Sequence, residues 1–203
     1  MVKLIYGTGN KGKLNLMREY LEGLDLEIIG LDEVDAVLEE PEECGKKPLE
    51  NARQKAEYYY SVLKQPVFSC DSGLFIEGLS EEEQPGVHVR NVNGKRLTDA
   101  EMTAHYRKIA HRLGGKCKAK YVNGICLVLS DTEKYESDGE EIGSEPFFLV
   151  EEAVAQRDEG FPLDPISIEP KSGKYFTECN DRGDYGPSRN GFRRFFIESC
   201  GLE

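Results

Sequence analysis

The chain has no tryptophan, and no apolar run approaches the ~20 residues that a membrane-spanning helix needs. Its amino terminus also lacks the charged, apolar and small-residue regions of a signal peptide. These absences exclude an integral membrane protein with helical spans. We therefore expect a cytoplasmic location and no membrane partner.

Metal-binding cysteine and histidine patterns are also missing. The six cysteines form no C-x-x-C pair, so neither a zinc ribbon nor a disulfide scaffold is indicated. The three histidines show no metal-ligand spacing either. We expect the cysteines to be mostly reduced thiols.

Positive charge is scarce. The 203 residues include 26 basic and 38 acidic ones, which gives a formal net charge of −12. This balance argues against a broad basic surface that grips a nucleic acid polymer. A small polyanionic substrate remains possible if a few lysines and a divalent cation neutralise it locally.

The most informative segment is the start of the chain, where the apolar run 2–6 leads into Gly7-Thr8-Gly9-Asn10-Lys11-Gly12-Lys13. We call residues 7–13 the glycine turn. Glycines let backbone N–H groups approach an anion, and a following helix and lysine add positive potential. The spacing fits a P-loop, but Leu14 stands where that motif needs Ser or Thr for magnesium. An ordinary P-loop NTPase is therefore disfavoured, and a plain Gly/Asn turn stays an alternative.

Apolar periodicity outlines the rest of the chain. It predicts strands near 26–30, 66–70, 74–76, 118–129 and 146–150, and helices over 14–24, 48–65, 98–111 and 192–197. The acidic run 32–43 is expected to be a loop, the stretch 80–95 an exposed loop or a hairpin crossing, and residues 71–73 a turn. Alternating strands and helices without a Pro/Ser linker predict one α/β domain over 1–203 with a mixed sheet.

Separate segments together resemble the inosine triphosphate pyrophosphatase, or Ham1-like, family. Its Thr-Gly-Asn-x-Gly-Lys pattern matches residues 8–13, and its Glu-Glu-x-Gly and Glu-Asn-Ala patterns match 42–45 and 50–52. Its Asp-Asp-Ser-Gly-Leu pattern is similar to 70–74, and its Pro-Gly-Val matches 85–87. Order and spacing both agree, and further short matches lie near 160–165 and 187–196.

The resemblance implies magnesium-dependent hydrolysis of non-canonical purine nucleoside triphosphates such as ITP, dITP and XTP to the monophosphate and pyrophosphate. It also implies an elongated sheet flanked by helices, two lobes around a nucleotide cleft, and a homodimer. The implied metal ligands are Glu42 and Asp71, with Glu43 a close rival for the first. The implied catalytic residues are Asp71, Lys13 and Lys55. The implied substrate contacts are Thr8, Gly9, Asn10, Lys11, Gly12, Lys13, Asn51, Lys55, Ser72, Phe161, Asp164, Ser188 and Arg189.

Base recognition departs from the family pattern. The family's Gly-Phe-Gly-Tyr/Trp-Asp-Pro is Gly160-Phe-Pro-Leu-Asp-Pro165 here, which keeps a stacking ring in Phe161 and an acceptor in Asp164 but loses the second aromatic. The family's Ser-His-Arg is Pro187-Ser188-Arg189, without the histidine. We therefore expect triphosphate hydrolysis, with a base preference that can differ from that of the relatives.

Plainer structural roles compete with these assignments. Glu42 alone would be a solvated loop residue, Asp71 a capping residue, Lys55 a solvent-facing helix lysine and Phe161 a core ring. Two further functions also stay open: a non-catalytic nucleotide-binding or regulatory protein, and a magnesium phosphatase on another small phosphate ester. Release of pyrophosphate would distinguish the nucleoside triphosphate pyrophosphatase from the magnesium phosphatase.

Overall fold

The structure is a computed structural model that describes residues 1–179 and 188–202. A mixed seven-stranded sheet runs in the order β2-β1-β3-β6-β8-β9, with β7 beside β6, and β4 and β5 form a separate hairpin. The strands are β1 (Val2–Tyr6), β2 (Leu26–Gly30), β3 (Val67–Ile76), β4 (Asn91–Val92), β5 (Lys95–Arg96), β6 (Lys116–Ser130), β7 (Glu133–Ser137), β8 (Phe147–Val150) and β9 (Ser167–Ile168). The α-helices are α1 (Lys11–Tyr20), α2 (Pro48–Leu63), α3 (Asp99–Arg112) and α4 (Ser188–Cys200). The 3₁₀ helices are η1 (Leu31–Glu33), η2 (Glu81–Glu83), η3 (Glu140–Ile142), η4 (Asp164–Ile166) and η5 (Phe176–Glu178).

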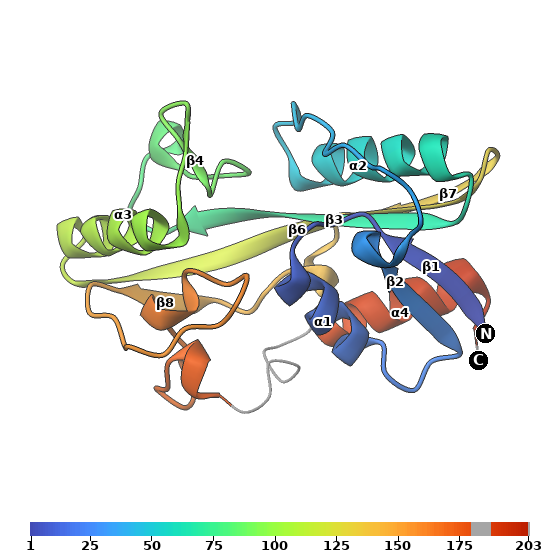
Figure 1. Cartoon of the computed structure of the whole chain (residues 1–203). Coiled ribbons are helices and arrows are strands. Elements are labelled where there is room, and N and C mark those ends of the chain that lie inside the picture. The colour runs from blue at the N-terminus through green and yellow to red at the C-terminus, as the bar shows by residue number, and fades with distance from the viewer. Residues whose placement is uncertain (180–187, 203) are drawn as a thin grey trace.

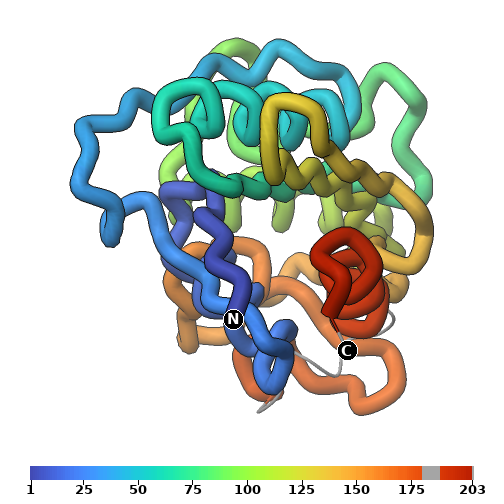
Figure 2. The backbone as a smooth tube through the Cα atoms, turned by 90° about the vertical axis from the view of Figure 1, so that its right-hand side faces the viewer, coloured from blue at the N-terminus to red at the C-terminus, as the bar shows by residue number. Residues whose placement is uncertain are grey.

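Helices cover both faces of the long antiparallel pair β3–β6. Figure 1 shows α2 on one face, α1 and α4 on the other, and α3 near the far end of the pair. The parallel strands β1 and β2 extend the sheet from β3, and both chain ends lie at this side of the molecule, as Figure 2 also shows. The expected mixed, elongated sheet flanked by helices is confirmed.

The β3–β6 pair carries two separate hydrophobic clusters on one face. Phe68 and Cys70 belong to a cluster with α1 and α4, and Leu74 and Ile76 belong to another with α3 and β8. Because side chains alternate along a strand, Ser72 lies on the same face between these clusters. Its partner on β6 is Asn123. A polar break therefore separates the two apolar halves of the sheet.

The predicted turn at residues 71–73 is wrong. Strand β3 continues through it, and Asp71, Ser72 and Gly73 pair with Gly124, Asn123 and Val122 of β6. Turn-forming residue types normally end a strand, but here an uninterrupted ladder to a fifteen-residue partner strand overrides that preference. Asp71 is thus held by a sheet and not by a flexible loop.

The other predicted helices and strands are present with shifted ends, whereas the short strand β9 and the 3₁₀ helices were not predicted. Pro48 is the first residue of α2, and Thr98 caps α3, accepting a hydrogen bond from the Glu101 N–H at 3.3 Å. Strand β7 was not predicted, because its run of charged residues lacks apolar alternation. Across residues 1–179 and 188–202, every helix is too short or too polar to cross a membrane.

Candidate active site

The glycine turn links β1 to α1 and presents the start of that helix. Asn10 is the N-cap of α1, and its Oδ1 accepts a hydrogen bond from the Lys13 N–H at 3.0 Å. Gly7 lies so close to β3 that a Cβ there would meet the Ser69 hydroxyl and, at 2.7 Å, the Tyr59 ring. The first turn of α1 contains no acidic residue. Its remaining free N–H groups and Lys13 thus form a region suited to an anion.

Asp71 is the centre of a group of polar side chains from separate segments, which we call the Asp71 network. Asn51 Nδ2 donates to Asp71 Oδ2 at 3.1 Å, and Lys55 Nζ lies 3.4 Å from Asp71 Oδ1. Lys55 Nζ also donates to Glu43 Oε1 at 2.9 Å. Asp71 is only 7% exposed and Asn51 only 1%. Asp71, Asn51 and Lys55 are therefore largely desolvated, and their charges interact more strongly than at the surface, whereas Glu43 lies at the exposed edge of the network.

The start of α2 lies directly against β6 because Gly124 has no side chain. A Cβ at Gly124 would overlap the Leu49 backbone and lie 2.7 Å from the Pro48 carbonyl carbon. Gly124 is also the β6 partner of Asp71. This close approach brings Asn51 and Lys55, on the next turns of α2, over Asp71.

Opposing effects act on the Lys55 ammonium. Burial lowers its pKa, but the negative charges of Asp71 and Glu43 outweigh burial and leave the pKa above its usual value. Burial raises the pKa of the nearby Cys70 thiol to about 11, against the positive charges of Lys13 and Lys55. Lys13 from the glycine turn and Lys55 from α2 therefore both act on the same part of β3.

The structure connects Glu43, rather than its neighbour, to Asp71. In the part of the chain that the structure describes, no hydrogen bond or ion pair joins Glu42 to Lys55 or Asp71. Within the same residues, no group of three His, Cys, Asp or Glu side chains could hold a metal ion by itself. The carboxylates that the structure brings together here are those of Glu43 and Asp71, on either side of Lys55 Nζ.

The 160–165 segment, which we call the base segment, lies directly against the glycine turn. Asn10 Nδ2 donates to the Gly160 carbonyl at 3.1 Å, and a Cβ at Gly12 would lie 2.7 Å from the Phe161 ring. Asp164 begins η4 and is buried, with 9% exposure. Burial and then the charge of Asp164 raise the pKa of Tyr121. The structure thus brings two motifs 150 residues apart into contact.

The other predicted substrate contacts lie around these groups. Thr8 Oγ1 accepts from the Asn10 N–H at 3.2 Å, Gly9 and Lys11 are exposed, and Ser72 lies in the polar break of β3. Ser188 and Arg189 form the first turn of α4, and Pro187 lies outside the described residues. Substrate contact by each of these residues stays a prediction.

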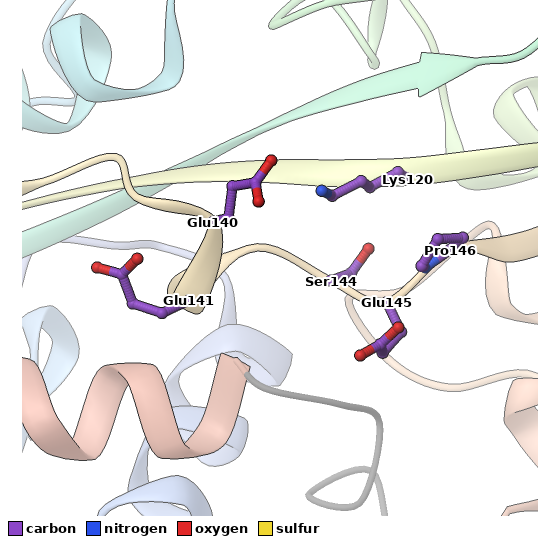
Figure 3. Close-up of a pocket in the computed structure, with 6 residues that line it drawn as sticks. All are labelled: Lys120, Glu140, Glu141, Ser144, Glu145 and Pro146. Carbon is purple, nitrogen blue, oxygen red and sulfur yellow. The ribbon is translucent and has the colours of Figure 1, made fainter.

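A surface pocket elsewhere has the wrong charge for a triphosphate. It has a volume of about 340 Å³ and lies between β6 and the segment that carries η3. Figure 3 shows its lining residues, which are Lys120, Glu140, Glu141, Ser144, Glu145 and Pro146. Three carboxylates against one ammonium repel a polyanion. The glycine turn and the Asp71 network are the better candidate site.

A sequence profile of the Ham1 family matches residues 4–183. The chain belongs to the Ham1 family. This Ham1 chain is 33% identical over 183 residues to a dITP/XTP pyrophosphatase of Mannheimia succiniciproducens, covering 87% of this chain and 86% of the relative. It is 34% identical over 181 residues to a dITP/XTP pyrophosphatase of Thermus thermophilus, covering 87% and 81%.

Solved structures of Ham1 proteins share the fold. The Staphylococcus aureus Ham1 protein superimposes with a TM-score of 0.69 at 23% identity, covering 98% of each chain. A Ham1 protein from Coxiella burnetii gives a TM-score of 0.70 at 24% identity, covering 98% of this chain and 96% of the other. The arrangement of the sheet and helices is therefore that of the Ham1 family.

Sequence reasoning missed the residues that assemble the site without offering a charge. Gly124 allows the start of α2 to lie close to β6. The Gly45 N–H donates to Asn51 Oδ1 at 2.8 Å, which orients the Asn51 amide toward Asp71. A glycine inside a predicted strand signals close backbone approach, so Gly124 carried a usable signal. Gly45 lies within the Glu-Glu-x-Gly pattern, but no local signal in the sequence indicates its hydrogen bond to Asn51.

Thiol reactivity should report the burial of the site. We expect Cys44, which is exposed, to react with iodoacetamide at pH 8 much faster than Cys70 and Cys126. Burial raises the pKa of Cys126 to about 12, as it raises the pKa of Cys70, so both thiols stay protonated and covered. Peptide mass spectrometry against time measures the three rates. Equal rates at Cys44 and Cys70 would show that β3 is open at Asp71.

Proposed function

We propose that this Ham1 chain hydrolyses nucleoside triphosphates to the monophosphate and pyrophosphate. The observation that carries the proposal is the Asp71 network, which lies beside an anion-suited glycine turn in a chain one third identical to dITP/XTP pyrophosphatases. The family resemblance and these relatives together make ITP, dITP and XTP the substrates to test first.

The proposed roles follow from charge and position. Backbone N–H groups at the start of α1, with Lys13, bind the phosphate chain, and Lys55 offsets charge that develops on it during hydrolysis. Asp71 orients the attacking water and accepts its proton. Asn51 fixes one Asp71 oxygen through its 3.1 Å hydrogen bond, so the carboxylate is held in place before substrate arrives. A positioned acid, a cation and an anion cradle are the parts that phosphoryl-group chemistry requires.

Magnesium fits the donor set of the network. Mg²⁺ prefers oxygen ligands, keeps several waters and is commonly held by one or two carboxylates together with substrate phosphates. Asp71 and one member of the Glu42–Glu43 pair would hold it, and the Lys55 contacts favour Glu43. When bound, the ion would neutralise phosphate charge. In this structure the Lys55 ammonium lies between the Glu43 and Asp71 carboxylates, so it provides the positive charge there.

Purine selection is proposed for the base segment. Phe161 offers a ring to cover a base, and Asp164 can accept a hydrogen bond from the N1–H that hypoxanthine, xanthine and guanine share. Adenine lacks this donor. Ser188 and Arg189 are the proposed further contacts of the base.

A cytoplasmic location and a homodimer are also proposed. The location rests on the sequence pattern, and the homodimer rests on the family resemblance. Light scattering of the purified protein should give twice the mass of one chain. The mass of a single chain at micromolar concentration would contradict the dimer.

The reaction can be tested with a panel of triphosphates. We expect purified protein with Mg²⁺ to release monophosphate and pyrophosphate from ITP, dITP and XTP, and much less from ATP. Chromatography that resolves pyrophosphate from orthophosphate identifies which phosphoanhydride bond is cleaved. Stepwise orthophosphate release would instead identify a phosphatase, and no turnover of any triphosphate would identify a binding protein. An unchanged rate when EDTA replaces Mg²⁺ would exclude the proposed cofactor.

A further inference from the structure

Asn10 uses both ends of its side-chain amide, and each end contacts a different part of the molecule. Its Oδ1 accepts from the Lys13 N–H at 3.0 Å within the glycine turn, and its Nδ2 donates to the Gly160 carbonyl of the base segment at 3.1 Å. The acceptor and donor partners together fix which way the amide points. Rotation of Asn10 would break both contacts.

Glycines on both sides make this contact possible. Gly160 has a φ of +82°, and a Cβ there would overlap Asn10 Oδ1 and lie 3.2 Å from Gly12 Cα. A Cβ at Gly12 would overlap the Glu159 carbonyl and lie 2.7 Å from the Phe161 ring. The backbone of the base segment therefore rests directly on the backbone of the glycine turn.

This contact joins the halves of the molecule that the polar break divides. The glycine turn leads into α1, whose buried residues Leu14 and Met17 belong to one hydrophobic cluster, whereas Leu163 and Ile166, which follow Phe161, belong to the other. A displacement of the glycine turn must therefore move the base segment or break the Asn10 hydrogen bond.

We propose that Asn10 is a positioning residue that couples occupation of the glycine turn to the placement of Phe161 and Asp164. The proposal rests on the proposed function, because it assigns the coupling to a site that holds phosphate at one end and a base at the other. An anion at the start of α1 polarises the Lys13 N–H and, through Oδ1, the Asn10 amide that holds Gly160. Coupling of this kind is reciprocal, so a bound base also improves phosphate binding.

The absence of tryptophan provides a direct test. Phe161→Trp creates a single-tryptophan protein that reports on the base segment. Inorganic tripolyphosphate, which has no base, should change the emission of this tryptophan on binding. In the Asn10→Ser background the helix cap is kept, since serine is a good N-cap residue, but the donor to Gly160 is lost. We expect most of the emission change per bound tripolyphosphate to be lost, because the hydrogen bond that links the glycine turn to Gly160 is absent.

A matched control separates coupling from a general effect on α1. Asn15→Ser makes the same chemical change on an exposed position of the same helix and should leave the emission change unaltered. Gly160→Ala disturbs the same contact from the base segment and should reduce the emission change as Asn10→Ser does. The double variant should show no further reduction of the emission change. An equal emission change in wild-type and Asn10→Ser backgrounds, at equal saturation by calorimetry, would overturn the proposal.

Two further measurements apply if the Phe161→Trp variant does not fold or if tripolyphosphate does not bind. Should Phe161→Trp not fold, fluorophenylalanine labelling of the nine phenylalanines gives the same readout by ¹⁹F NMR, with Phe161→Leu identifying the signal. Failure of tripolyphosphate to bind at all would contradict the proposed function rather than the contact. The contact is then read from a double-mutant cycle in urea between Asn10→Ser and Gly160→Ala. Additive losses of stability in that cycle would overturn the proposal, and coupled losses would support it.

Discussion

Asp71→Asn should lower the rate of nucleoside triphosphate hydrolysis by about a hundredfold to ten-thousandfold, the range expected for loss of a positioned general base. Asparagine has nearly the same shape and keeps an oxygen for the 3.1 Å hydrogen bond from Asn51. It removes the negative charge that faces Lys55 and the group able to accept a proton from water. Steady-state kinetics with ITP and Mg²⁺ measures the change in kcat.

The fold should survive this substitution. Lys55 keeps its ion pair with Glu43, so no unpaired charge is left buried. We expect the melting temperature to fall by about 4 °C or less, which corresponds to roughly 1 kcal/mol in a chain of this size. Asp131→Asn makes the same chemical change in an exposed surface ion pair with Lys64 and should leave kcat unchanged. An Asp71→Asn protein that kept more than a tenth of the wild-type activity would contradict the assignment of Asp71.

Gly124→Ala should be the most damaging single-methyl change in the candidate site. Its Cβ would meet backbone atoms of Pro48 and Leu49, which cannot rotate away as a flexible side chain can. The start of α2 must then move off the sheet and take Asn51 and Lys55 away from Asp71. Overpacking of this kind typically costs about 1–3 kcal/mol.

We therefore expect Gly124→Ala to lose both stability and activity. A cost of ~2 kcal/mol lowers the melting temperature by about 4–8 °C in a chain of this length, measured by calorimetry. The residual folded protein should show a reduced kcat, because the Asp71 network is displaced. Gly9→Ala is the stability control, since a Cβ at Gly9 has no described heavy atom within 4 Å. Equal melting temperatures of Gly124→Ala and Gly9→Ala would mean that α2 does not depend on this close approach.

Local patterns in the sequence predicted much of the fold correctly. Helices with apolar spacing and a clear start, such as α2 at Pro48 and α3 after Thr98, could be located because capping and periodicity are encoded within a few residues. The continuation of β3 through Asp71 could not, because the Asp-Ser-Gly sequence prefers a turn by itself. Only the ladder to β6, a strand more than forty residues further along the chain, stabilises the extended conformation there.

The sequence by itself determined the chemical inventory of this protein: a glycine turn at a helix start, carboxylates and lysines at family spacing, and an excess of acidic over basic residues. The tertiary structure decided which of these groups meet. It joined Glu43 to Lys55 and Asp71, turned Asn51 onto the same carboxylate, and set the base segment on the glycine turn through Asn10. The physical reason is that side-chain types are local properties, whereas contacts between distant segments depend on strand register and on glycines that let backbones touch.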